Sequence, residues 1–405
     1  MKHLMKYLMK NVAFAIFAAL SSILFASPAL HAEGVPVAPV YVGFDGSYGV
    51  KNSTSSKAIE LGLRAAMHEV NAAGGVLGGR PLELITKDNR SVAARGLVNL
   101  EEFAAVEDLV AVVCDRFSPV ILQQIEPAHA KQMPLLDVWG SADDIIEHTF
   151  TPSYTFRLSL KDSWAMPAML KQALAKGGNK VGVLLPNTGW GRSNQKALDA
   201  ALAHSPQAQL VGSIWYNWGE LDMLQHYRSL ISLGAQSILF VTNDLEGSLL
   251  VRQLGEHPDG LSVPIISHWG VTGGDMVEAS GPALAGLDFS FVQTFSFARA
   301  RPQALATFKK TVKEIAGIEE VEKLASPGGV GHAYDMMHIL AKAIDVAGST
   351  NRASIRDALE NLGPHNGLAR DYNPPFSANS HEALGPELLF FAKYSADGMI
   401  VPVEP

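Results

Sequence analysis

Two short polar segments in this sequence combine residue types that can hold a small anion. The first is Asp115-Arg116-Phe117-Ser118-Pro119, which directly follows the apolar, β-branched run Leu109–Cys114. The second is Trp139-Gly140-Ser141, which follows the run Leu135–Val138. Each segment offers a hydroxyl group, and Gly140 allows close approach of the backbone. A Ser-Pro pair at a helix start also places unpaired backbone N–H groups nearby, and these stabilise a carboxylate.

An ordinary structural role for both segments stays open at this point. Ser118 can simply cap its own helix. Asp143 and Asp144 suit the first turn of a helix that follows Ser141. If the two segments instead lie side by side, their hydroxyl groups converge on one anion.

The elements that position these segments alternate between short apolar strands and amphipathic helices. The expected strands are Val37–Phe44, Leu82–Thr86, Leu109–Cys114, Leu135–Val138, Val181–Leu185, Leu210–Trp215, Ser237–Val241, Pro264–His268 and Leu287–Val292. The expected helices are Ser56–Asn71, Val92–Val106, Ile121–Lys131, Ala165–Lys176, Asn194–His204, Met223–Leu233, Gln303–Ile315, His332–Ala347 and Ser354–Leu362. This rhythm predicts an α/β fold with parallel sheets covered by helices on both faces. Such sheets bind ligands outside the carboxyl ends of their strands, where both polar segments lie.

The first 32 residues have the layout of a secretory signal peptide. Three lysines precede the apolar run Val12–Phe25, and small residues follow it, with cleavage expected after Ala29 or Ala32. The run is shorter than the roughly 20 residues of a spanning helix, so we expect a soluble, exported protein rather than an anchored one. The mature chain of 405 − 32 = 373 residues predicts two domains.

Charge and motif content argue against several classes of protein. Removal of three lysines and no acid changes the formal charge from −8 to −11, which disfavours nucleic-acid binding. The single cysteine, Cys114, cannot form an internal disulfide. Gly328-Gly329-Val330-Gly331 lacks the spacing of a dinucleotide-binding loop and is interpreted as a turn. The 13 histidines do not cluster at metal-ligand spacing. We therefore expect no enzymatic activity, no metal and no cofactor.

A longer pattern begins in the helix-like segment Gly62–Ala73. It continues through the glycine stop Gly74-Gly75 and a tight turn to a strand that ends at Lys87-Asp88-Asn89. This pattern closely resembles the periplasmic leucine/isoleucine/valine-binding protein family of ABC-transporter receptors. The resemblance covers nearly the whole mature chain, including the segments Asp137–Ser141, Asn187–Gly191, Val251–Gln253 and Ala333–Asp335.

The resemblance implies a type I periplasmic binding fold, with two doubly wound parallel-sheet lobes that close on a ligand. Three crossovers are then expected near Arg157–Leu160, Thr294–Phe297 and Arg370–Asn373. They assign 33–157 plus 296–371 to the N-terminal lobe and 158–295 plus 372–405 to the C-terminal lobe. The family is non-enzymatic and hands its ligand to a membrane permease, which suits a monomer. Some relatives instead present their ligand to a membrane kinase or chemoreceptor, and that alternative stays open.

The resemblance also carries ligand-binding positions onto this chain. Ser118 falls on the hydroxyl that holds the ligand carboxylate in amino-acid-binding members. The other positions that match the family's binding loops are Arg116, Phe117, Trp139, Gly140, Ser141, Trp190, Asn243 and Asp244. The loop Tyr48–Ser55 matches the first cleft loop but departs from it in length and polarity.

Trp269 marks a departure from the family pattern. It stands where amino-acid-binding members place an acid that pairs with the ligand ammonium, and a buried ammonium without an anion is costly. Either Asp244 or Asp137 takes over that role, or the ligand has no ammonium. The aromatic residues favour an aromatic or other planar carboxylate, although each tryptophan can also pack in a lobe core. Arg116 is either a second anion contact or is neutralised by an acid. An ordinary receptor for branched-chain amino acids or amides is the alternative.

Overall fold

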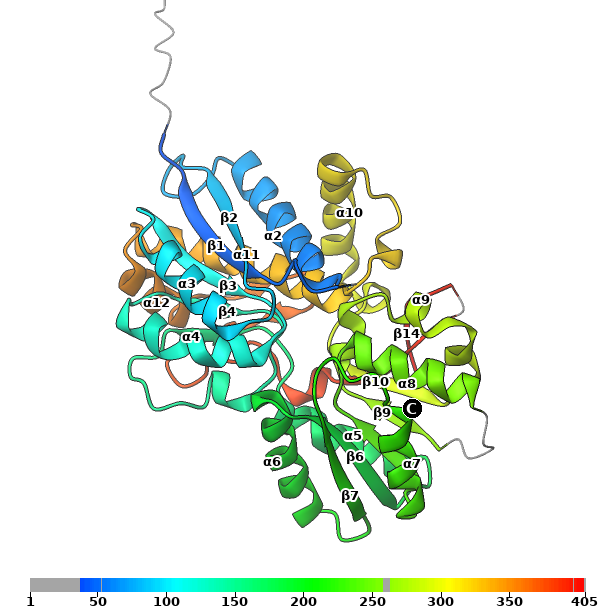
Figure 1. The fold of residues 1–405 in the computed structure, drawn as a ribbon. Coiled ribbons are helices and arrows are strands. Elements are labelled where there is room, and N and C mark those ends of the chain that lie inside the picture. The colour runs from blue at the N-terminus through cyan, green and yellow to red at the C-terminus, as the bar shows by residue number, and fades with distance from the viewer. Residues whose placement is uncertain (1–36, 52, 258–262, 396, 404–405) are drawn as a thin grey trace, which may run out of the picture. The chain divides into compact units, whose positions relative to one another are not determined.

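The computed structural model describes residues 37–51, 53–257, 263–395 and 397–403. The predicted signal peptide at 1–32 therefore lies outside the described residues. From Pro39 onward the chain forms one compact unit that contains two large β-sheets (Figure 1).

The first sheet contains five parallel strands in the order β2-β1-β3-β4-β5. These strands are β1 (Val40–Gly46), β2 (Leu82–Asp88), β3 (Leu109–Cys114), β4 (Leu135–Asp137) and β5 (Thr155–Arg157). Every residue of β3 is buried, as its apolar composition indicates. Val113 packs on one face of the sheet, whereas Val112 and Cys114 pack on the other.

Helices cover both faces of this sheet. They are α2 (Ser55–Ala72), α3 (Ala93–Ala104), α4 (Ser118–Ala130), α10 (Pro302–Ala316), α11 (Pro327–Ala347) and α12 (Arg352–Glu360). Helices α2 and α11 share one core, and α3 and α4 share the other. Gly62 lets α2 and α11 approach closely, because a Cβ there would lie 2.3 Å from the Val330 carbonyl oxygen.

The second sheet contains seven strands in the order β14-β13-β10-β9-β8-β6-β7. The parallel strands are β6 (Lys180–Pro186), β7 (Gln209–Tyr216), β8 (Ser237–Phe240), β9 (Ile265–Ser267) and β10 (Phe289–Gln293). At one edge β13 (Phe390–Tyr394) and β14 (Ile400–Pro402) run antiparallel. This sheet is therefore mixed, because the C-terminal segment adds a hairpin instead of a helical crossover.

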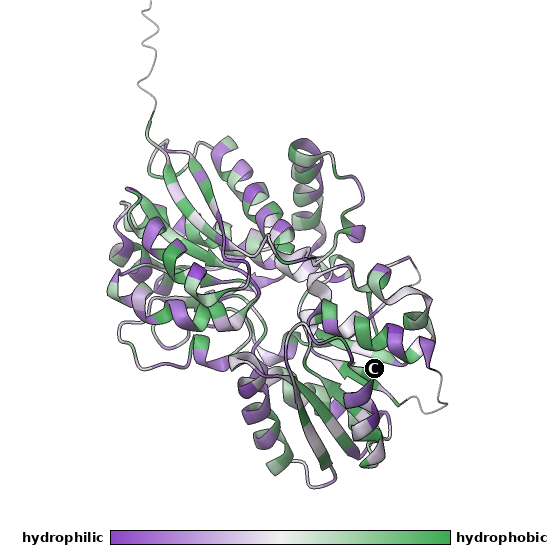
Figure 2. Ribbon diagram, viewed as in Figure 1, coloured by the Kyte–Doolittle hydropathy of each residue, from purple (hydrophilic) through white to green (hydrophobic). Residues whose placement is uncertain are grey.

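Helices again lie on both faces of the second sheet. They are α5 (Asp162–Ala175), α6 (Gly189–Ala203), α7 (Leu224–Ser232), α8 (Asp244–Glu256) and the short α9 (Met276–Ser280). Helices α5 and α6 share one hydrophobic core, and α7 and α8 share the other. A small sheet of β11 (His365–Asn366) and β12 (Asp371–Tyr372) follows α12. Figure 2 shows hydrophobic residues along the strands and alternating character along the helices.

The predicted strands and helices are all present, with ends that differ by a few residues. Among the elements that were not predicted from the sequence are β5, β11, β12, α8 and α9. Strand β5 contains three residues, which is too short for a visible pattern, and α8 contains Gly247 and Gly255, which weaken a helical signal.

The interpretation of Gly328–Gly331 as a turn is wrong. These residues belong to the first turns of α11. Their missing side chains make room for aromatic rings: a Cβ on Gly329 would lie 2.5 Å from Trp139 Cζ3, and one on Gly331 would lie 2.8 Å from Phe295 Cε1. The helix tolerates these glycines because tertiary packing compensates for their low helix propensity.

The end of β5 is tied to a segment far along the chain. Arg157 and Glu382 form a parallel bridge, and the Arg157 guanidinium donates from Nε (2.8 Å) and Nη2 (2.5 Å) to the Glu382 carboxylate. Glu382 thus lies beside the first sheet, past the predicted lobe boundary at 371–372. The lobe boundaries themselves stay a prediction.

Candidate ligand-binding site

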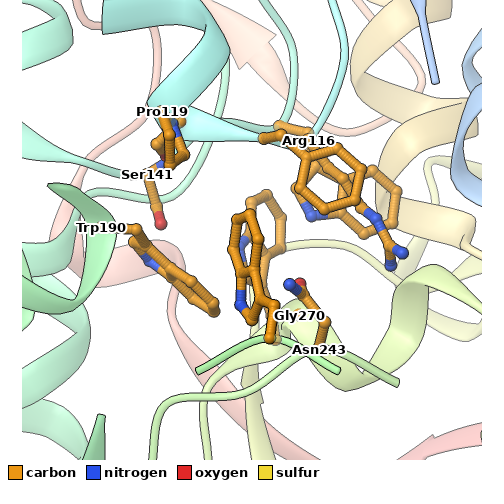
Figure 3. Close-up of a pocket in the computed structure, with 11 residues that line it drawn as sticks. Arg116, Pro119, Ser141, Trp190, Asn243 and Gly270 are labelled. Atoms are coloured by element: carbon orange, nitrogen blue, oxygen red, sulfur yellow. The ribbon is translucent and has the colours of Figure 1, made fainter. Parts of the chain in front are cut away.

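One pocket is lined by loops that follow the carboxyl ends of six strands. Residues Arg116 to Pro119 follow β3, Trp139 and Ser141 follow β4, and Trp190, Trp218, Asn243, Trp269 and Gly270 follow β6, β7, β8 and β9. Side chains that follow the strands of both sheets surround a small cavity of about 10 Å³ (Figure 3). This position agrees with the rule for ligand sites in open parallel sheets.

The Ser118 hydroxyl connects the first two loops. Its oxygen accepts hydrogen bonds from the backbone N–H groups of Ser141 (3.2 Å) and Ala142 (3.3 Å). Ser118 is the first residue of α4, whose N-cap residue, Phe117, makes no side-chain capping bond. The expectation that Ser118 caps its own helix is therefore wrong, because its oxygen bonds the neighbouring loop instead.

Asp137 fixes the turn that carries Trp139 and Gly140. Its Oδ1 accepts from both backbone N–H groups, at 3.0 Å and 2.6 Å. Burial raises the pKa of the Asp137 carboxyl to about 7, although the Arg157 charge and these two hydrogen bonds act against the shift. Gly140 does not line the pocket. It packs against α4, where a Cβ would lie 2.5 Å from Ile121 Cδ1.

Tryptophans that follow strands of both sheets meet at the pocket. The Trp139 and Trp269 rings have centroids 5.3 Å apart with an interplanar angle of 40°. Trp269 is 1 % exposed, and its ring also contacts the His332 ring at 5.8 Å. Both tryptophans belong to the core cluster and also line the pocket. The functional and the packing interpretation of these residues are thus compatible.

Trp190 is held by two buried polar residues. Its indole Nε1 donates to Asp162 Oδ1 at 3.2 Å, and its ring stands edge-to-face on His268 at 5.0 Å. His268 Nε2 lies 3.2 Å from the same Asp162 oxygen. Because the Trp190 N–H is bound, the residue offers the pocket an apolar surface.

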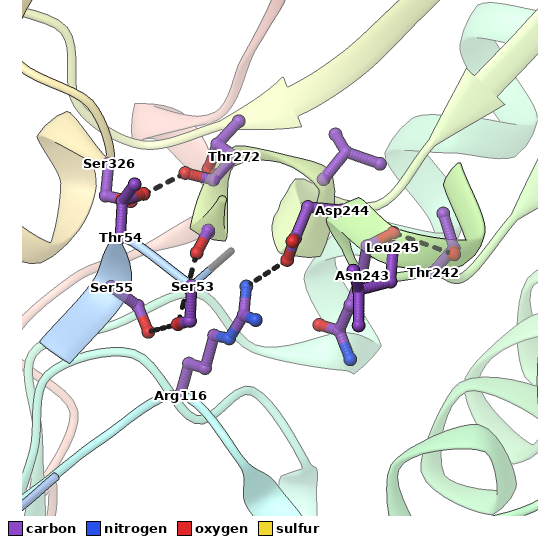
Figure 4. A network of polar contacts seen from close by, with 12 residues as sticks. Ser53, Thr54, Ser55, Arg116, Thr242, Asn243, Asp244, Leu245, Thr272 and Ser326 are labelled. Atoms are coloured by element: carbon purple, nitrogen blue, oxygen red, sulfur yellow. Dashed lines mark hydrogen bonds and ion pairs between the residues drawn. The ribbon is translucent and has the colours of Figure 1, made fainter. Parts of the chain in front are cut away.

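Arg116 pairs with Asp244 beside the pocket. Its Nη1 lies 2.6 Å from Asp244 Oδ1, and each side chain is 2 % exposed (Figure 4). Gly273 makes room for the guanidinium, since a Cβ there would lie 1.7 Å from Nη1. Asp244 is therefore committed to Arg116 and does not line the pocket. Of the alternatives for Arg116, the structure supports neutralisation by an acid from the other sheet.

The loop before α2 also reaches the second sheet. Thr54 N–H donates to the Gly273 carbonyl (2.9 Å), and the Thr54 and Ser326 hydroxyls lie 2.7 Å apart. Ser326 in turn donates to the Thr272 carbonyl at 2.8 Å (Figure 4). This polar contact lies beside the Arg116–Asp244 pair.

The structure brings most of the predicted site residues together. All of them line the pocket except Gly140 and Asp244. Sequence reasoning missed Pro119, Trp218 and Gly270 as lining residues. Trp218 follows the end of β7, so the strand-end rule could have found it. Gly270 lies close to the backbone after β8, since a Cβ there would lie 2.4 Å from the Thr242 carbonyl oxygen.

Within the described part of the chain, no group of three or more His, Cys, Asp or Glu side chains is placed to hold a metal ion. Among the described helices, none has both the length and the apolar character that crossing a membrane requires.

Comparison with known proteins adds to this geometry. A family model described as periplasmic binding protein matches residues 39–398. A "Leu/Ile/Val-binding protein homolog 2" from Brucella abortus is 24 % identical over 371 residues, which are 90 % of this chain and 93 % of the relative.

Solved structures share the fold. A periplasmic binding protein type 1 from Bordetella pertussis Tohama I superposes with a TM-score of 0.79 at 19 % identity, over 90 % of this chain and 100 % of that one. A solute-binding protein of an ABC transporter from R. palustris, solved in complex with benzoate, has a TM-score of 0.73 at 14 % identity, over 90 % and 95 % of the two chains.

Proposed function

This chain belongs to the periplasmic binding protein family, and on that basis we propose that it is the receptor of an ABC importer for a small planar carboxylate without an ammonium group. The family consists of extracytoplasmic solute-binding proteins that work with ABC-transporter permeases. The receptor closes its two lobes around the ligand, because only the closed state contacts it from both sides. We further propose that it is exported to the periplasm with its signal peptide removed and acts as a monomer without nucleic acid.

The hydrogen bonds that the Ser118 hydroxyl oxygen accepts carry this proposal. A serine hydroxyl has one donor and two acceptor positions. Both acceptor positions are occupied by the N–H groups of Ser141 and Ala142, so the proton remains to be donated. A carboxylate oxygen of the ligand is a suitable acceptor. The start of α4 adds the partial positive charge of a helix N-terminus, and the Ser141 hydroxyl points into the same space (Figure 3).

Asp244 and Asp137, the two acids considered as ammonium partners, are not available to an ammonium group. Asp244 is paired with Arg116. Asp137 is bonded to the Trp139 turn, and its raised pKa of about 7 disfavours the charged form. Among the described residues that line the pocket, none is an acid. A buried ammonium would therefore remain without a counter-charge.

The aromatic walls support a planar ligand body. Four of the six tryptophans in the sequence line the pocket, together with Phe117. Flat apolar surfaces of this kind suit a ring or another planar group. The benzoate complex of the R. palustris protein shows that this fold can take such a ligand.

A receptor for branched-chain amino acids is the second candidate, because the Brucella relative carries the name of a leucine/isoleucine/valine-binding protein. A thermal-shift screen separates the two. Ligands that bind only the folded state raise its melting temperature. Stabilisation by aromatic carboxylates such as benzoate supports our proposal, whereas stabilisation by leucine, isoleucine or valine alone would overturn the ligand class.

A further inference from the structure

Two buried donor groups at one end of the pocket lack a hydrogen-bond partner. They are Trp218 Nε1 and Arg116 Nε, and neither has a protein partner among the described residues. Both residues line the pocket. Buried polar groups are nearly always satisfied in folded proteins, so donors in a binding site without a protein partner need an acceptor from water or from a ligand. A bound ligand with a suitably placed oxygen atom can supply this acceptor.

The side chains that carry these two donors both lie near the Phe117 ring. The Arg116 guanidinium carbon lies 4.8 Å from the centre of the Phe117 ring, and the Trp218 ring centre lies 5.5 Å from it. Asn243 directs its amide group into the pocket from below (Figure 3). Ser141 and Pro119 lie on the opposite side of the same view. The pocket thus has a hydroxyl end at Ser118 and Ser141 and a donor-rich end around Phe117.

The charge at the donor-rich end selects the type of acceptor. Arg116 carries a positive charge, but Asp244 neutralises it at 2.6 Å. A second carboxylate at this end would therefore be buried without a net counter-charge. A hydroxyl, ether or carbonyl oxygen needs no counter-charge, and it can accept hydrogen bonds from the Trp218 N–H and from the Arg116 guanidinium, whose charge Asp244 already balances. Trp190 does not belong to this end, because its N–H is bound to Asp162.

From these observations we infer that the ligand is an aromatic monocarboxylic acid with a neutral oxygen acceptor opposite its carboxylate. The carboxylate binds at Ser118 and Ser141, and the second oxygen accepts from Trp218 Nε1 and Arg116 Nε. Trp218 and Asn243 then determine specificity. This inference rests on the proposed function and narrows its substrate class.

Calorimetric titration of the mature wild-type protein tests the inference with four probes: benzoate, 4-hydroxybenzoate, 4-methylbenzoate and benzene-1,4-dicarboxylate. We expect 4-hydroxybenzoate to bind about tenfold more tightly than benzoate, because it satisfies donors that are otherwise unmet. The methyl analogue has a similar size but no acceptor, so the unmet donors should not increase its affinity above that of benzoate. The dicarboxylate should bind more weakly than 4-hydroxybenzoate.

Two matched variants locate the effect. Trp218→Phe removes the unmet N–H and should reduce the preference for 4-hydroxybenzoate over benzoate by about fivefold. Trp190→Phe makes the same chemical change at a tryptophan whose N–H is already bound, so it should weaken both acids by a similar factor and leave their ratio unchanged. If Trp190→Phe changed this ratio and Trp218→Phe left it unchanged, the proposed role of Trp218 would be overturned.

The results separate this inference from the proposed function. If benzoate and 4-methylbenzoate bind as tightly as 4-hydroxybenzoate, the second acceptor is refuted while the carboxylate receptor stands. If the dicarboxylate binds most tightly, the neutral character of the donor-rich end is refuted. If none of the aromatic acids binds, the proposed function and this inference both fail.

Discussion

Arg116 and Asp244 form an ion pair that joins the loop after β3 to the first residue of α8, with 2.6 Å between Nη1 and Oδ1. Both side chains are almost fully buried. The two sheets thus meet through opposite charges beside the pocket. This contact leaves the pocket without net charge at that end and keeps Asp244 from any ligand ammonium.

Asp244→Asn should therefore change both stability and specificity. Loss of one partner of a buried pair costs about 3 kcal/mol, because the other charge stays buried without compensation. The released Arg116 charge should also strengthen binding of benzene-1,4-dicarboxylate relative to benzoate by about tenfold. Thermal unfolding and calorimetry measure the two effects.

Glu319→Gln is the control for this variant. Glu319 pairs with Lys313 at 2.8 Å, but both side chains are more than half exposed. Exposed pairs contribute little to stability, so this variant should behave as the wild type. If Asp244→Asn and Glu319→Gln had the same thermal stability and the same ligand preference, the importance of the buried pair would be contradicted.

Ser118→Ala combined with Ser141→Ala should weaken binding of benzoate by about tenfold or more, because each hydroxyl offers a hydrogen bond to a charged group. The Ser118 oxygen also accepts from the Ser141 loop, so the single Ser141→Ala variant serves as a control that leaves this link intact. Titration of the purified variants measures the affinity. An unchanged affinity in the double variant would refute the carboxylate position.

Gly329→Ala should destabilise the protein by about 1–3 kcal/mol through overpacking. Its Cβ would lie 2.5 Å from Trp139 Cζ3, so the ring must move and binding should weaken too. Gly328→Ala is a matched control in the same helix, since its nearest atom, Trp269 Cζ3, would lie at an ordinary 3.4 Å. Chemical denaturation compares them, and equal stability would contradict the close packing of Trp139 on α11.

Asp137 should make stability depend on pH. Burial raises its pKa from 3.8 to about 7 on folding. Its contribution is fully present below pH 4 and is lost as the pH rises through 7, because the folded state retains a proton that the unfolded state has released. Each unit of pKa difference corresponds to about 1.4 kcal/mol.

Asp137→Asn keeps an oxygen acceptor for the Trp139 turn but cannot ionise. The free energy of unfolding of the variant, relative to the wild type, should therefore rise between pH 4 and pH 8. Urea unfolding at several pH values measures this difference. A difference that is constant over this range, or that falls with pH, would contradict a raised pKa of Asp137.

The fold and much of the pocket could be predicted from the sequence because strand ends are visible as breaks in apolar runs. Ser118 and Ser141 were found in this way. The partner of Arg116 could not be found, because Asp244 lies 128 residues away and reaches it only through packing of the two sheets. The position of Gly329 inside a helix could not be predicted for the same reason, because it depends on packing against the distant Trp139 ring. The role of Ser118 was ambiguous, since its bond to Ser141 depends on how two loops are spaced.

The central claim is that the pocket accepts a carboxylate and has no partner for an ammonium group. The most direct measurement compares acids that differ only in the amine: 3-phenylpropanoate with phenylalanine, and 4-methylpentanoate with leucine, by calorimetric titration of the mature protein. Because a buried ammonium lacks a counter-charge, the amine-free acid should bind more tightly in each pair by about tenfold or more. Tighter binding of phenylalanine or leucine would contradict the claim and place an ammonium partner in this site.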